Sequence, residues 1–442
     1  MIRGSVHAHG VGGRQDLPIP FGLAVTAAAL AVVLSFLVLG LAWRESRYKG
    51  DSGGRPLPRA LTTVVDSSGL RWAIRVLGLV AAAYVALAAL AGPDVATNPT
   101  PGVVYVLLWV GIVPASLLLG PIWRTINPLR TLHLLLYKAL RLDPAVGALR
   151  MPERVGLWPA TGWLVAFTWL ELVAPDRATL PVIVAWFALF VGITLLGAVV
   201  FGSRWFDHAD PFEVYSGLVG RLSWLGRRTD GLLVARRPLE NLDGLPAHPG
   251  LTAAVAALLG STMYDSVSAS PWWDRWVQET GLVPTLAGTG GLLATMLVVY
   301  VTFTGAAWWA GRLAGTTGRG LPDLFAHSVV PIAVGYVVAH YFTLFVLEGQ
   351  RTLVLLSDPL GSGADWLGIG DLAENRWIAD QPTLVASIQV SAIVLGHVLG
   401  IVSAHDRAVR LFPRRSAVVA QLPLLGVMVG YTVGGLLLLF AA

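Results

Sequence analysis

Four ionisable side chains fall inside long apolar stretches of this sequence, at Glu171, Asp265, His340 and His397. Such groups are costly in a bilayer and usually line a cavity, a proton path or a ligand site. Histidine and carboxylate side chains can exchange protons near neutral pH, and together they can also ligate a divalent metal ion. All four are therefore candidate catalytic residues. In the alternative interpretation, each only pairs with another side chain and fastens two helices together.

The position of each residue along its predicted helix gives its depth. With a rise of about 1.5 Å per residue, Glu171, Asp265 and His340 all lie about 20 Å from the cytoplasmic ends of their helices. His397, on a descending helix, lies about 8 Å nearer the cytoplasm. We therefore expect the first three to share a site in the outer half of the membrane, and three helices could hold one metal ion through His340, Asp265 and Glu171.

The neighbours of two of these residues are also polar. Asp265 lies in GSTMYDSVSAS, where Ser261 and Ser268 share its helical face. Tyr336 and Thr343 share the face of His340, so we expect a hydroxyl group to orient the imidazole ring.

Histidine spacing disfavours haem as a cofactor. Stacked b-type haems need histidine pairs on one helical face, whereas His327 is rotated by roughly 220° from His340. A single haem between His340 and His397 is disfavoured by their difference in depth. One divalent metal ion is the only cofactor that the residues suggest.

Two further groups could bind metal. His7 and His9 form an HxH pair in a glycine-rich start, which could equally be a solvated tail. The segment WFDHADPFEVYS gathers four potential ligands, although Asp210 before Pro211 is also typical of a helix cap beside an interfacial anchor. These four are Asp207, His208, Asp210 and Glu213.

Composition assigns the chain to the membrane class. Of its 442 residues, 55% are hydrophobic and 13% are charged, and the mean hydropathy is +0.67. There is no cysteine, which excludes disulfides, thiolate metal sites and thiol nucleophiles. The net charge of +5 is distributed among loops and indicates topology rather than a nucleic-acid partner. GxSxG, HExxH and Walker motifs do not occur.

Hydropathy predicts an all-α, polytopic transmembrane helix bundle of about ten spans. The predicted spans are 21–43, 72–92, 103–123, 156–175, 180–202, 251–270, 283–311, 327–350, 383–404 and 417–441. Basic residues concentrate in every second loop, beginning with the first, so both termini are expected outside. Residues 1–20 are then an extracytoplasmic tail and 21–442 the bundle, with a cytoplasmic segment at 203–250 and an outer loop at 351–382.

Each long connection has a specific expectation. Apolar residues at helical spacing in 212–225 predict a helix along the membrane surface. The acidic outer loop could be a lid or a solvated connection. Small residues at Gly396 and Gly400, continued by Gly426, Gly430 and Gly434, predict close helix packing.

Four strings, AHGVGGRQDLPIP, GSTMYDS, PIAVGYVVAHYFTLFVLEGQ and GHVLGIVSAHDRA, carry a resemblance over nearly the whole chain. The sequence resembles a family of polytopic bacterial membrane proteins that bear the name fenitrothion hydrolase. The resemblance implies a place in the bacterial cytoplasmic membrane and hydrolysis of an organophosphorus triester. The matching positions of interest are His9, Asp265, His340, His397, His405 and Asp406.

Two functions are compatible with these residues. The first is a metal-dependent hydrolase of hydrophobic esters, with His340 and Asp265 as ligands and Glu171 as ligand or general base. The second is a transporter or permease component that uses the same residues as a proton or metal-ion pathway. The expected partners are membrane lipid and a hydrophobic small molecule or an ion. The sequence identifies no protein partner.

Overall fold

The computed structural model describes residues 14–316, 318 and 320–440. The predicted HxH pair of His7 and His9 lies outside these residues. Within them, eight helical segments are long and apolar enough to cross a membrane. They are α1 (Phe21–Ala42), α3 (Ser68–Ala91), Thr100–Leu119, α9 (Leu180–Phe201), α15 (Pro284–Leu313), Leu321–Leu355, α18 (Pro382–Leu411) and Val419–Leu439, which contains α19 (Leu422–Leu439). The prediction of an all-α membrane bundle is confirmed.

Two shorter helices occupy the other two predicted spans. Helix α8 (Trp158–Leu172) has 15 residues and α13 (Leu251–Ser268) has 18, whereas a span needs about 20 apolar residues. Fourteen of the 18 residues of α13 are buried, and the helix contacts α8, α15 and α17 (Val330–Leu355). These two helices carry Glu171 and Asp265. The count of ten spans and the outer location of the termini stay predictions.

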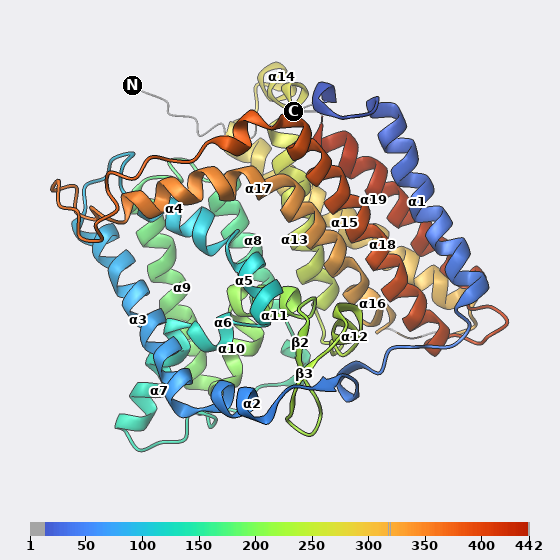
Figure 1. The fold of residues 1–442 in the computed structure, drawn as a ribbon, viewed down its shortest axis with the longest axis horizontal. Helices are drawn as coiled ribbons and strands as arrows, with labels where there is room; N and C mark the ends of the chain where they lie inside the picture. The colour runs from blue at the N-terminus through green and yellow to red at the C-terminus, as the bar shows by residue number, and fades with distance from the viewer. Residues whose placement is uncertain (1–13, 317, 319, 441–442) are drawn as a thin grey trace.

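The helices form two groups with a shared middle (Figure 1). Helices α1, α15, α18 and α19 gather on one side, and α3 and α9 lie on the other, while α8 and α13 lie between them and α17 runs across both groups. The most extensive contact joins α17 to α18. This arrangement places α13 and α17 at the centre of the molecule.

Two of these eight candidate segments are not continuous α-helices. Thr100–Leu119 consists of α4 (Thr100–Gly102), a π-helical turn at Val103–Leu108 and α5 (Ile112–Leu119). Leu321–Leu355 consists of α16 (Leu321–Phe325), a 3-10 turn at Ala326–Val329 and α17, with Pro331 in the first turn of α17. Proline lacks the N–H that would continue the preceding helix. Such interruptions are frequent at functional sites.

The segment 203–250 enters the bundle. It begins with α10 (Arg204–Ala209) and α11 (Pro211–Gly220), and nine of the ten residues of α11 are buried. Helix α11 packs against α5, α8 and α17. The expectation of a surface helix is therefore wrong. A helix that is largely apolar on every face is stable when it is enclosed, and α11 has almost no polar face to turn to water.

Short elements complete the predicted cytoplasmic side. A small antiparallel sheet has the order β1 (Arg55–Pro56), β3 (Leu233–Ala235) and β2 (Leu225–Arg227), with Val234 opposite both Pro56 and Gly226. The remaining helices are α2 (Arg59–Asp66), α6 (Trp123–Ile126), α7 (Pro128–Ala139), α12 (Pro238–Asp243) and, at the predicted outer side, α14 (Pro271–Thr280).

The acidic loop that is predicted to lie outside is organised by its own carboxylates. Helix α17 extends to Leu355, so the connection to α18 is shorter than expected. Asp358 accepts hydrogen bonds from the backbone N–H groups of Ser362 and Gly363, and Asp365 accepts two from residues 369 and 370. These acids therefore stabilise local turns.

The five predicted packing glycines fall into two classes. A Cβ at Gly396 would lie 2.6 Å from the carbonyl oxygen of Pro331, and a Cβ at Gly400 would lie 2.7 Å from that of Ser328. Close packing of α18 on α17 thus requires both glycines. A Cβ at Gly426, Gly430 or Gly434 would meet no atom within 4 Å. The packing prediction is wrong for these three, because their face of α19 is open.

Candidate functional site

Asp265 of α13 is the centre of a hydrogen-bonded group. Its Oδ2 lies 2.8 Å from Nε2 of His340 and accepts a hydrogen bond of 2.7 Å from the Tyr341 hydroxyl. On the other side of the imidazole, the Ser266 hydroxyl is 3.4 Å from Nδ1. Two pairs of neighbouring residues, Asp265–Ser266 on α13 and His340–Tyr341 on α17, therefore bring a carboxylate, an imidazole and two hydroxyl groups together.

Helix geometry explains this grouping. Consecutive residues of a helix point about 100° apart, so His340 and Tyr341 approach Asp265 from two directions. The hydroxyl expected from the face of His340 is supplied by another helix. The Tyr336 hydroxyl donates to the carbonyl oxygen of Gly435 at 3.2 Å, and the hydroxyl that contacts the ring belongs to Ser266.

Glu171 of α8 joins this group electrostatically. Its charge interacts with that of Asp265, and the hydroxyls of Tyr341 and Tyr215 are also within electrostatic range of it. The Oε2 atom of Glu171 is enclosed and has no hydrogen-bond partner among the described residues. The Arg177 guanidinium is close enough to oppose part of this negative charge. Glu171 thus lies within electrostatic range of Asp265, which contacts His340 directly.

The predicted metal site is not assembled there. Among the described residues, no group of three or more His, Asp or Glu side chains is placed to hold a metal ion. His340 and Asp265 form a direct contact of 2.8 Å, whereas a bound metal ion would stand between two ligand atoms at about 2.0–2.2 Å from each. The geometry is that of a proton-sharing pair.

His397 lies apart from this group. Its Nδ1 donates to the carbonyl oxygen of Ile393 at 2.8 Å, and its ring lines a separate cavity. Neither Asp265 nor His340 lines that cavity. The fourth candidate therefore belongs to a different part of the bundle.

His405 and Asp406, at the end of α18, have structural partners. The two ring nitrogens of His405 contact Oε1 of Gln421 at 3.0 Å and the carbonyl oxygen of Trp43 at 2.9 Å. Asp406 accepts from the Trp43 indole at 3.0 Å and from the Ser46 hydroxyl and the Arg47 backbone N–H at 2.7 Å. Both residues fasten the loop after α1 to the bundle.

A second ionic group surrounds the start of α11. Asp210 caps this helix by accepting from the N–H groups of Phe212 and Glu213, as the Asp–Pro pattern predicts. Asn127 donates to Asp210 at 2.8 Å, and Arg130 donates to Glu213 at 2.5 and 3.0 Å. These acids are engaged in hydrogen bonds and ion pairs, which argues against the alternative that they ligate a metal ion.

The other two residues of that motif have different partners. Asp207 pairs with Arg124 at 2.6 Å and with Arg130 at 3.2 Å. His208 places Nδ1 2.9 Å from the carbonyl oxygen of Gly156. Two carboxylates, those of Asp207 and Glu213, therefore share two guanidinium groups beside the start of α11.

Glu213 has an unusual proton affinity for an acid beside arginine. Burial raises the pKa of Glu213 from 4.5 to about 7, and the Arg130 charge opposes this rise. Asp210 and Asp207 add to the increase by charge repulsion. Burial dominates because the carboxyl group is enclosed and Arg130 is shared with Asp207. Glu213 lies outside the candidate membrane spans and can exchange a proton near neutral pH.

Helix α11 connects the two groups. One turn beyond Glu213, the Ser216 hydroxyl lies 2.8 Å from that of Ser116 on α5. Tyr215 packs on Trp109 with ring centroids 4.8 Å apart and interacts electrostatically with Glu171. Hydrophobic patterning did not reveal this connection, because it places α11 at the surface. The apolar spacing of 212–225 and the Asp–Pro cap both predicted a helix there, but neither predicted its burial.

Comparisons with protein-family models, with curated proteins and with solved structures give no match. The chain is a helical, multi-pass membrane protein with buried His, Asp and Glu side chains.

Proposed function

We propose that this protein is a proton-coupled transporter in which Asp265 and His340 form the proton-carrying pair. The direct contact between a carboxylate and an imidazole at the centre of the bundle carries this proposal. A single proton can move between the two groups along one hydrogen bond, with little movement of either helix. The resemblance to a family of polytopic bacterial membrane proteins supports the bacterial cytoplasmic membrane as its location.

The two ionic groups support a path for the proton. From the cytoplasmic side, Glu213 can take up a proton near neutral pH, and α11 leads from it to Tyr215 and Glu171. The charge of Glu171 interacts in turn with Asp265, the partner of His340. Rows of acids, histidines and hydroxyls are typical of proton relays in membranes. Interrupted helices near such rows are typical of transporters.

A hydrolase remains the second candidate because of Ser266. Its hydroxyl, the His340 ring and the Asp265 carboxylate follow the order of a serine hydrolase relay, with contacts of 3.4 and 2.8 Å. The fenitrothion hydrolase resemblance favours the same interpretation. Against it, Ser266 is only 1% exposed, and a nucleophile must reach its substrate.

Proton flux tests the first proposal without knowledge of the cargo. We would reconstitute the purified protein into liposomes with an internal pH-sensitive dye and impose a potassium diffusion potential with valinomycin. Wild-type liposomes should acidify faster than empty liposomes, and Asp265→Asn should return the rate to that of empty liposomes. Asparagine keeps the size of the side chain and can still accept from Tyr341, but it cannot carry a proton.

Two variants and one substrate complete the test. Asp358→Asn removes an acid from the outer loop and should leave the flux unchanged. An Asp265→Asn protein that is stably folded and conducts protons like wild type would contradict the proposal. Hydrolysis of a chromogenic phosphotriester by the wild type that is abolished in Ser266→Ala would favour the hydrolase instead.

A further inference from the structure

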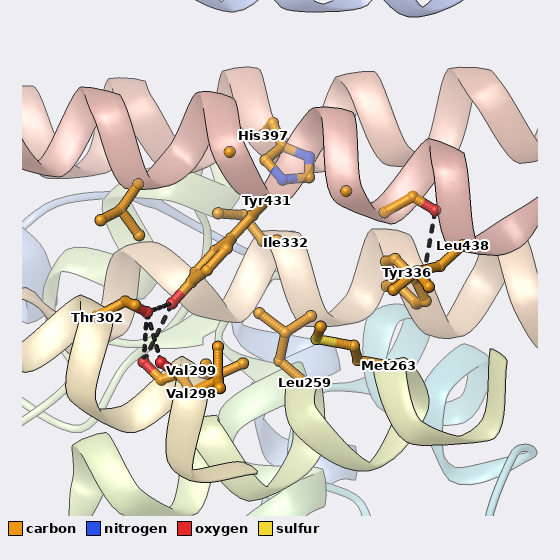
Figure 2. A pocket seen from close by; sticks show the side chains of 14 residues that line it. Leu259, Met263, Val298, Val299, Thr302, Ile332, Tyr336, His397, Tyr431 and Leu438 are labelled. Carbon is orange, nitrogen blue, oxygen red and sulfur yellow. Dashed lines mark hydrogen bonds between the residues drawn. The ribbon is translucent and has the colours of Figure 1, made fainter. Parts of the chain in front are cut away.

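A cavity of about 310 Å³ lies between five helices, and neither Asp265 nor His340 lines it. Its walls come from α13, α15, α17, α18 and α19 and are mostly apolar, with Leu259, Met263 and Ile332 among them. Figure 2 shows His397 on one side of the space beside Ile332, with Leu259 and Met263 across from it. Small-molecule sites typically have volumes of about 300–1,000 Å³ and apolar walls with few polar groups.

One polar atom of this cavity is left without a partner. The hydroxyls of Thr302 and Tyr431 bond to each other at 2.6 Å and to backbone carbonyl oxygens of α15, and the Tyr336 hydroxyl donates to Gly435. His397 is 1% exposed, and its Nε2 has no hydrogen-bond partner among the described residues. A buried polar atom in this state costs about 1–3 kcal/mol, which a ligand could recover.

The chemistry of that atom specifies its partner. Because Nδ1 of His397 faces the carbonyl oxygen of Ile393, Nδ1 carries the ring proton. In the neutral ring, Nε2 then holds a lone pair and accepts a hydrogen bond. The complementary ligand group is a donor such as a hydroxyl, attached to an apolar body that suits the other walls.

The entrance of the cavity faces the bilayer. Among its lining residues, Val298 is 49% exposed, and Thr302 and Gly430 are also exposed. All three lie on helices long and apolar enough to cross a membrane. An apolar molecule dissolved in the lipid can therefore enter between α15 and α19. The missing side chains of Gly430 and Gly434 keep the α19 wall open.

We infer that this cavity binds an apolar molecule with a hydroxyl group, which enters from the lipid and donates a hydrogen bond to Nε2 of His397. Neither Asp265 nor His340 lines this site, and the inference holds whether or not the protein carries protons. It also gives His397 a role: the histidine is the polar specificity residue of a hydrophobic pocket.

A pair of photoreactive probes tests the inference. We would reconstitute the protein in lipid nanodiscs with a diazirine-bearing phenol or with its O-methyl ether, irradiate it and locate the label by mass spectrometry. The phenol should label the cavity walls saturably, and at least about tenfold more strongly than the ether, which cannot donate a hydrogen bond. Equal labelling by the two probes would overturn the inference.

Three variants separate the pocket from general lipid exposure. Gly434→Leu places a side chain in the cavity from a position where an added Cβ meets nothing within 4 Å, and it should abolish labelling by both probes. Gly426→Leu is the matched control: this glycine is equally open on the same helix but does not line the cavity, so labelling should not change. His397→Phe should keep the labelling by the ether and lose the preference for the phenol. Undiminished labelling of Gly434→Leu, or a retained preference in His397→Phe, would also overturn the inference.

Discussion

At the scale of single residues, buried ionisable groups in this protein have three different roles. Asp265 and His340 contact each other, His405 and Asp406 hold a loop, and His397 faces an apolar cavity. The residue types and depths alone do not distinguish these roles. The surroundings of each side chain distinguish these roles, because an imidazole forms different hydrogen bonds with a carboxylate and with a backbone carbonyl, and none with an empty space.

Glu213 gives a prediction for stability as a function of pH. Its pKa in the folded protein, about 7, lies above its usual value of 4.5. The folded state therefore binds this proton more tightly than the unfolded state, so the contribution of Glu213 to stability is present at low pH and is lost as the pH rises from about 4.5 to about 7. In Glu213→Gln, which cannot ionise, the decrease in stability over this range should be smaller by about 1–3 kcal/mol.

Thermal unfolding in detergent at several pH values measures this effect. The control is Glu153→Gln, which removes a negative charge from an exposed turn. The unfolding temperature of Glu213→Gln could instead fall as steeply as that of wild type when the pH is raised. That result would show that Arg130 keeps Glu213 ionised over the whole pH range.

At the scale of secondary-structure elements, the contact between α17 and α18 depends on backbone proximity. Gly396 and Gly400 of α18 face backbone carbonyl oxygens in the first turn of α17 and in the 3-10 turn before it, where a side chain has no room. In lipid no hydrophobic effect holds the helices together, so their association depends on close packing. Small residues permit the backbones to approach closely enough for that packing. The open glycines of α19 follow the same spacing but lie beside a cavity or the lipid.

Gly400→Leu should destabilise the protein by about 1–3 kcal/mol, by analogy with overpacked soluble cores. A Cβ alone would already lie 2.7 Å from the Ser328 carbonyl oxygen, so α18 must shift away from α17. The unfolding temperature in detergent measures the effect, with Gly426→Leu as the matched substitution in open space. Equal melting of the two variants would contradict the assignment of the α17–α18 contact.

At the scale of the whole molecule, the charge of the loops predicts the topology. Only this rule assigns a side of the membrane to the two termini, to Ser362 in the outer loop and to the β2–β3 turn. The two polar groups joined by α11 then lie toward opposite sides of the membrane, which is the arrangement that a transmembrane proton path requires.

Introduced cysteines test this topology, since the chain has none of its own. Ser362→Cys should react with a membrane-impermeant thiol reagent in whole cells, and Thr229→Cys, exposed in the β2–β3 turn, should react only after the cells are opened. Thr229 is a better position than the neighbouring Gly231, whose φ of 85° disfavours a side chain. Labelling with the opposite pattern would invert the proposed direction of the path.

The amino-acid sequence by itself determined the class of this protein and most of its helices. Long apolar segments must be helical in lipid, because every backbone polar group has to be paired within its own segment. That argument uses only residues that are near one another in the sequence. The same is true of the predictions of the Asp210 cap and of the depth of Glu171, Asp265 and His340. The sequence therefore predicted the bundle and three members of the candidate site.

Only the tertiary structure decided which side chains meet. The contact of Ser266 with His340, the enclosure of α11 and the cavity beside His397 all depend on how helices distant in sequence are rotated and packed. Hydropathy cannot predict these rotations when a helix is apolar on nearly every side, as α11 is. The same glycine spacing thus produced a tight contact on α18 and an open wall on α19, because the neighbouring helix is close in one case and distant in the other.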